Sequence, residues 1–143
     1  YTVARTAWND VALEVYHDPK HPWNAPIMLD TARAAMAYFS QAFGPYPLRS
    51  FRLLEYPRYR SAAQAFPGAV PYSEGAGFLF DLRQWAPLDY TTIHELAHHW
   101  WGGLVYGAKM QGRQVLNETM AQYSTFMLFK QQERQEWLRR ILR

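Results

Sequence analysis

The chain has 143 residues, of which 49% are hydrophobic and 17% aromatic, and its formal net charge is +3. That much apolar material is enough for a folded core, so the composition excludes an intrinsically disordered segment. The absence of cysteine excludes disulfides and thiolate metal sites. Aromatic residues do not alternate with basic ones as they do on nucleic-acid platforms, so we expect no nucleic-acid partner. The C-terminal basic residues predict a solvated helix face, with an acidic partner as the alternative: Arg134, Arg139, Arg140 and Arg143.

The length fits a single domain covering residues 1–143. No stretch approaches the roughly 18 apolar residues of a membrane span, and the N-terminus lacks the charged and apolar regions of a signal peptide. We therefore expect no membrane contact by this segment itself, within a parent protein that could be membrane-bound. The sequence identifies no compartment.

Hydrophobic periodicity predicts strands and a helix in the first half of the chain. Alternation predicts strands at residues 11–16 and 51–56. Between them a helix is expected from about Asn24, with one apolar face, to the stop signals at Gly44 and Pro45. Residues 57–73 show no regular period and predict a long loop.

The second half predicts one short strand and two helices. The strand is expected at residues 78–82, the first helix at about 90–106, and the last helix from about residue 116 towards the C-terminus. A connection should cover residues 107–113. This order predicts an α+β fold in which a short mixed or antiparallel sheet packs on helices that carry the polar residues of interest.

Three of the five histidines fall between residues 94 and 99, in the segment His94-Glu95-Leu96-Ala97-His98 and the following His99. On a helix, residues four apart lie on one face, so two imidazoles at this spacing can bind one metal ion. Glu95 points about a quarter-turn away and can reach a metal-bound water without becoming a ligand. This is the HExxH pattern of zinc hydrolases, although five residues alone also occur in unrelated proteins. His99 is off that face, and we expect it to pack or hydrogen-bond.

Glu118 is the candidate third ligand. A catalytic zinc needs three protein ligands and an open position for water, and His2Glu is a standard set. The interval after His98 lets one helix end and a second present Glu118. A helix N-terminal carboxylate with no metal role is the alternative. With one zinc bound, Glu95 would act as the general base for water attacking a peptide carbonyl and would pass the proton to the leaving amine.

The motif from His94 to Gly102, followed by Leu116-Asn117-Glu118, resembles the M1 family of zinc aminopeptidases. The segment Phe43-Gly44-Pro45-Tyr46-Pro47 also resembles one that precedes a core strand in that family. The resemblance covers roughly residues 30–125. It implies a thermolysin-like (gluzincin) catalytic domain, of which this chain would be the N-terminal part, with zinc on His94, His98 and Glu118 and with Glu95 as the base.

The resemblance also implies a peptide substrate with a free N-terminus. A family glutamate that binds the peptide amine matches Glu74 in Pro71-Tyr72-Ser73-Glu74-Gly75, although the four neighbouring residues differ. A surface carboxylate in a turn is the alternative for Glu74. The family's transition-state tyrosine lies well downstream of the glutamate ligand, so we expect it outside this chain, and Tyr123 is too close to take that role.

The interval between His98 and Glu118 is one residue longer than is usual in the family. It is similar in length to the interval of the thermolysin-like peptidases. In its Trp-Trp-Gly and Glu-x-x-Ala-Gln-Tyr stretches, the chain resembles variant M1-like domains, some of them fused to bacterial membrane permeases. Two alternatives to an aminopeptidase stay open. One is a thermolysin-like endopeptidase, and the other is a non-catalytic, zinc-stabilised domain of a larger membrane-associated protein.

Overall fold

The computed structural model describes residues 1–58, 60, 62–81, 87–132, 134, 136, 138 and 139. Four strands form one mixed sheet in the order β1-β2-β3-β4. They are β1 (Thr2–Trp8), β2 (Val11–His17), β3 (Ser50–Tyr56) and β4 (Ala69–Ser73). β1 pairs antiparallel with β2, whereas β2 with β3 and β3 with β4 pair in parallel.

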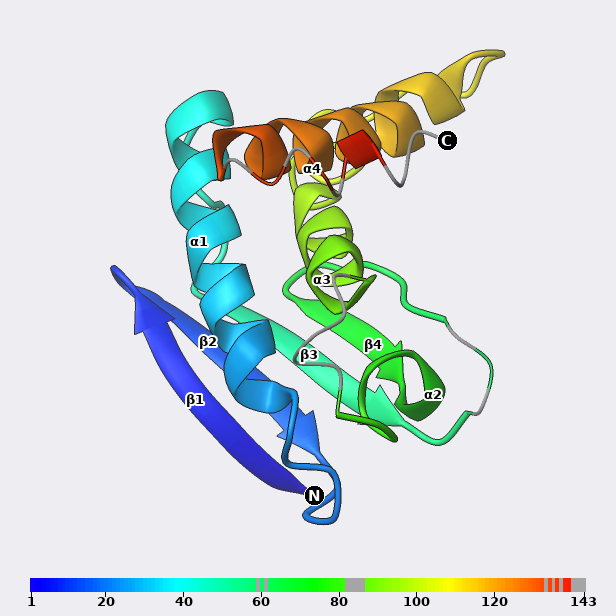
Figure 1. Ribbon diagram of the computed structural model, residues 1–143. Helices are drawn as coiled ribbons and strands as arrows, with labels where there is room; N and C mark the ends of the chain where they lie inside the picture. Colours follow the sequence, from blue (N-terminus) through cyan, green and yellow to red (C-terminus); the bar gives the residue numbers. More distant parts are fainter. Residues whose placement is uncertain are drawn as a thin grey trace.

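The helices are α1 (Ala25–Phe43), α2 (Glu74–Gly77), α3 (Pro87–Ala97), the π-helix η1 (Val115–Thr119) and α4 (Met120–Gln131). α1 packs on β1 and β2 and against α3, and α3 in turn packs against α4. In Figure 1, α1 and α3 lie side by side over the sheet and α4 runs across their ends. This small mixed sheet with helices confirms the predicted α+β class. Within the described residues, no helix is long and apolar enough to cross a membrane.

The core forms because each element presents one apolar side. In β2, the side chains that alternate inward are fully buried, and the same alternation buries Phe51 and Leu53 in β3. α1 contributes a stripe at helical spacing that includes Met28, Met36 and Phe39, all with no exposed surface. Burial of each such side chain stabilises the fold by about 1.5–3 kcal/mol. The sheet and α1 therefore form a stable core on which the later segments pack.

The predicted elements of the first half are confirmed at 11–16, 24–43 and 51–56, each with one boundary shifted by one residue. β1 was not predicted. It is an edge strand whose small and polar residues are largely exposed, so its alternation carries little apolar signal. The predicted loop 57–73 was wrong at its end, because residues 69–73 form β4 beside β3.

The predicted strand at 78–82 was wrong. The chain forms α2 and then a turn through residues 78–80, and Leu82 lies outside the described residues. Asn24 holds this turn, because its side-chain amide donates to the carbonyls of Gly77 and Phe80 at 2.7 Å each. A Cβ on Gly77 would lie 2.6 Å from Met28 and from Tyr72, so this close packing requires glycine.

The predicted helix 90–106 was too long at its C-terminal end. α3 ends at Ala97, where the amides of His99 and Trp100 bond to carbonyls only three residues back. Gly102 follows at a φ of +104°, which favours glycine and turns the chain away. The basic C-terminal face is also less solvated than predicted, because Arg134 pairs with Asp89 at 2.7 Å. Arg139 is exposed, and Arg140 and Arg143 lie outside the described residues.

Candidate metal centre

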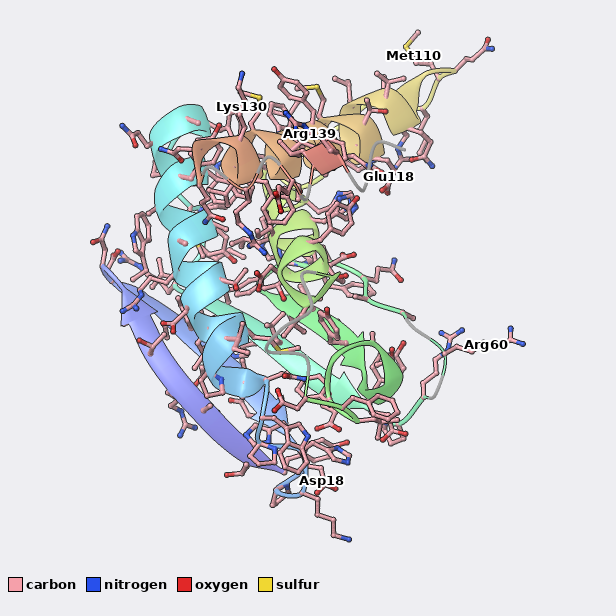
Figure 2. The ribbon with its side chains drawn as sticks, in the orientation of Figure 1. Asp18, Arg60, Met110, Glu118, Lys130 and Arg139 are labelled. Atoms are coloured by element: carbon pink, nitrogen blue, oxygen red, sulfur yellow. The ribbon has the colours of Figure 1, made fainter. Side chains whose placement is uncertain are left out.

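Three predicted ligands meet where the end of α3 faces η1. The Nε2 atoms of His94 and His98 lie 3.2 Å apart. The Oε2 atom of Glu118 is 3.5 Å from the first and 3.4 Å from the second. Figure 2 shows Glu118 on the side of the last helical segment that faces α3.

The spacing of these atoms fits a tetrahedral zinc ion. Bonds of about 2.0 Å at tetrahedral angles put neighbouring ligand atoms about 3.3 Å apart. All three measured edges lie within a few tenths of an ångström of this value. The described residues supply three protein ligands to this cluster, which leaves a tetrahedral ion one position for water.

The hydrogen bonding of His98 also fits a metal ligand. Its Nδ1 lies 3.1 Å from the carbonyl of Trp101, an acceptor, so Nδ1 carries the proton and Nε2 presents a lone pair to the cluster. Burial and then the neighbouring His98 lower the pKa of His94, which favours its neutral form. Two imidazole nitrogens and a carboxylate oxygen thus converge on one point, an arrangement that fits a bound cation.

η1 positions Glu118. The amide of Met120 bonds to the carbonyl of Val115, five residues back, which is the π-helical pattern. A π turn spaces its hydrogen bonds one residue further apart than an α-helix. The turn that contains Glu118 places its carboxylate opposite the two histidines. The indole of Trp101 donates to Ser124 at 2.8 Å and so joins the segment after α3 to α4.

Glu95 lies beside this cluster and is 8% exposed. Burial raises the pKa of its carboxyl, and a hydrogen bond with the backbone amide of Ala65 lowers it in part. A carboxyl with a raised pKa binds a proton more readily, which suits a general base. The partner amide belongs to residues 63–67, which the sequence assigned to an irregular loop. Its alanines carry no functional side chain, so no sequence signal pointed to them.

A pocket of about 740 Å³ opens on the cluster. It is bounded by residues 63–67, by the turn after α3 and by Asn117 and Glu118 of η1, and the three ligands and Glu95 are in its wall. His99 is buried beneath it, with Nε2 2.9 Å from the carbonyl of Phe66 and Nδ1 3.2 Å from the hydroxyl of Tyr46. The predicted packing role of His99 is confirmed, since both ring nitrogens have protein partners.

Glu74 lies elsewhere, in a second cluster with His21 and Glu55. Nδ1 of His21 lies 2.5 Å from Glu55 Oε1, and the amide of Asp18 donates to Glu55 Oε2 at 2.5 Å. Both distances are shorter than an ordinary N–H···O hydrogen bond and well below the edge of about 3.3 Å between two zinc ligands. Glu74 is not among the described residues that line the pocket. The structure therefore joins four of the five predicted site residues and separates Glu74 from them.

A family model and several curated relatives are similar to this chain. The model of the peptidase family M1 domain matches residues 27–142. Human endoplasmic reticulum aminopeptidase 1 is 32% identical over 110 residues, which are 73% of this chain and 12% of that protein. Probable aminopeptidase 1 of Sulfurisphaera tokodaii is 33% identical over 107 residues, 71% of this chain and 13% of the relative.

Tricorn protease-interacting factor F2 of Thermoplasma acidophilum is similar to the same extent, at 32% identity over 108 residues, with 71% of this chain and 13% of that protein covered. The aligned part of the chain thus spans about an eighth of the length of each of these relatives.

Proposed function

The chain belongs to peptidase family M1, and we propose that it holds one zinc ion on His94, His98 and Glu118 and hydrolyses peptide bonds next to a free N-terminus. The observation that carries this proposal is the triangle of acceptor atoms with edges of 3.2–3.5 Å. A bound zinc would supply a Lewis acid for the carbonyl and lower the pKa of its water to about 7.

The chain's own residues divide the remaining work. Glu95 takes the proton of the attacking water and delivers it to the leaving amine. Its burial and its bond to the Ala65 amide hold the carboxylate at one place beside the ligands. The carbonyl of Trp101 fixes the ring of His98, whose Nε2 would then be the atom that holds the ion.

Two of the compared relatives are named aminopeptidases, which supports a substrate with a free amine. Contact between Glu74 and that amine remains a prediction, and the place of Glu74 beside His21 and Glu55 gives it no support. Thermolysin-like architecture, with this chain as part of a catalytic domain, is likewise part of the proposal.

The test compares alanine 4-nitroanilide with its N-acetylated form on the zinc-loaded chain. We expect 4-nitroaniline release from the free amine alone, abolished by a chelator and by Glu95→Gln. Equal cleavage of the acetylated substrate would instead favour an endopeptidase. Because the transition-state tyrosine is expected outside this chain, slow turnover is expected of the isolated segment. Cleavage that Glu95→Gln leaves unchanged would contradict the proposal, and complete lack of cleavage at high chain concentration would favour the zinc-stabilised, non-catalytic alternative.

A further inference from the structure

One permanent cation lies in the wall of the pocket. Among the described residues that line it, Arg113 is the single lysine or arginine. The other charged lining residues are Glu95 and Glu118, which the zinc chemistry uses. None of the described carboxylates forms an ion pair with Arg113. Its charge is therefore available to a molecule in the pocket.

The guanidinium is held in place by Tyr106, which also lines the pocket. The central carbon of the guanidinium lies 4.4 Å from the centroid of the Tyr106 ring. One of the guanidinium N–H groups donates a hydrogen bond to the Tyr106 hydroxyl. Both residues belong to the segment between α3 and η1 that projects from the body of the molecule, with Met110 at its tip (Figures 1 and 2). A cation–π contact of this kind orients the guanidinium.

Gly107 allows this arrangement. A Cβ at residue 107 would lie 2.9 Å from Cγ of Arg113 and 3.3 Å from its Cα. The chain next to Tyr106 therefore packs directly on Arg113, and a larger residue would push the two apart. Three residues thus fix one positive group at the pocket wall, and none of them is a metal ligand.

We propose that Arg113, held by Tyr106, binds a carboxylate of the peptide in the pocket, so that the site prefers acidic peptides. This inference rests on the proposed peptidase function. The planar guanidinium offers paired N–H donors that match a carboxylate, and such charge-assisted bonds are about twice as strong as neutral ones. The carboxylate is that of the peptide C-terminus or of an aspartate or glutamate side chain.

The test measures binding by calorimetry to the zinc-loaded Glu95→Gln chain, which cannot turn the peptides over. The ligands are Ala-Ala-Ala with a free C-terminal carboxylate, the same peptide as its amide, and the amides of Ala-Asp-Ala and Ala-Ala-Asp. We expect at least one of the three charged peptides to bind roughly tenfold or more tightly than the neutral amide. Which one it is identifies the source of the carboxylate.

Arg113→Gln should remove this preference while zinc content stays unchanged. The matched control is Lys109→Gln, which removes an exposed cation that does not line the pocket and should keep the preference. The preference should also persist in the metal-free chain, which excludes direct binding of the carboxylate to zinc.

Equal binding of charged and neutral peptides would overturn the role of Arg113 and leave the peptidase proposal intact. Retention of the preference in Arg113→Gln would have the same meaning. Failure of every peptide to bind would overturn both proposals.

Discussion

Two clusters of the same residue types behave differently in this molecule. His94, His98 and Glu118 direct acceptor atoms at one another across 3.2–3.5 Å, and the side chain of Glu118 is 60% exposed. In the other cluster, His21 and Glu55 are 2.5 Å apart and the Glu55 side chain is 3% exposed. The first arrangement fits a cation bound from outside, whereas in the second the carboxylate of Glu55 is already bonded to His21 and to the Asp18 amide. Spacing and hydrogen bonding therefore favour the first cluster as the proposed metal site.

The largest expected difference between the two regions is in kcat, which should depend on Glu95 beside the His94, His98 and Glu118 cluster and not on Glu55 in the other cluster. Replacing Glu95 by Gln removes the general base but changes no ligand, so we expect kcat to fall by roughly 10²–10⁴-fold with zinc content unchanged. Steady-state hydrolysis of the free-amine nitroanilide measures this. Glu55→Gln is the matched control in the other cluster and should leave kcat within a few-fold of the wild type.

The free energy of unfolding should depend more on Glu55 than on Glu118. Glu55→Ala removes the partner of the Asp18 amide and of His21, so we expect a loss of about 1–3 kcal/mol of unfolding free energy. Glu118→Ala should cost little in the metal-free chain, because its side chain is 60% exposed and the ion pairs that the described residues form with it are those of the two histidines. Urea unfolding in the presence of a chelator compares the two. A larger loss from Glu118→Ala than from Glu55→Ala would contradict the distinction.

A smaller effect is expected in acid, away from both clusters. Hydrogen bonds from Arg5 and then Arg52 lower the pKa of Glu14, against a partial opposing effect of burial. A lowered folded-state pKa stabilises the fold above the unfolded-state value near 4.5, and this contribution disappears as the pH falls through the folded-state pKa. The urea midpoint of wild type should exceed that of Glu14→Gln at pH 7. The difference should shrink as the pH is lowered below 4.5, and a difference that stays constant with pH would be the contrary result.

Much of the metal centre could be predicted from the sequence because its information is local. The spacing of His94 and His98 places both rings on one helical face, and the structure keeps that face although α3 ends earlier than predicted. The position of Glu118 opposite them depends on η1. A π turn has no clear sequence signal, so the later element was expected to be an ordinary helix.

Glu74 shows where local information fails. Its proposed role rested on the position of one glutamate among four differing neighbours, and its contacts are set by residues far away in the sequence. His21 and Glu55 reach it only because β2, β3 and β4 lie side by side. β4 was assigned to a loop for the same reason, since it pairs with the distant β3. Residues 63–67 form isolated bridges to β4 and contact Glu95 through the backbone amide of Ala65, so their side chains give no sequence signal.

The most direct test of the central claim is zinc content of the purified chain after zinc loading and dialysis, measured by atomic absorption. The wild type should hold about one zinc per chain, and His94→Ala and Glu118→Ala should lose it, because each removes one of three ligands. Glu74→Ala and His21→Ala should retain it. Zinc retained in Glu118→Ala and lost in Glu74→Ala would show that the ion belongs to the other cluster and would contradict the assignment.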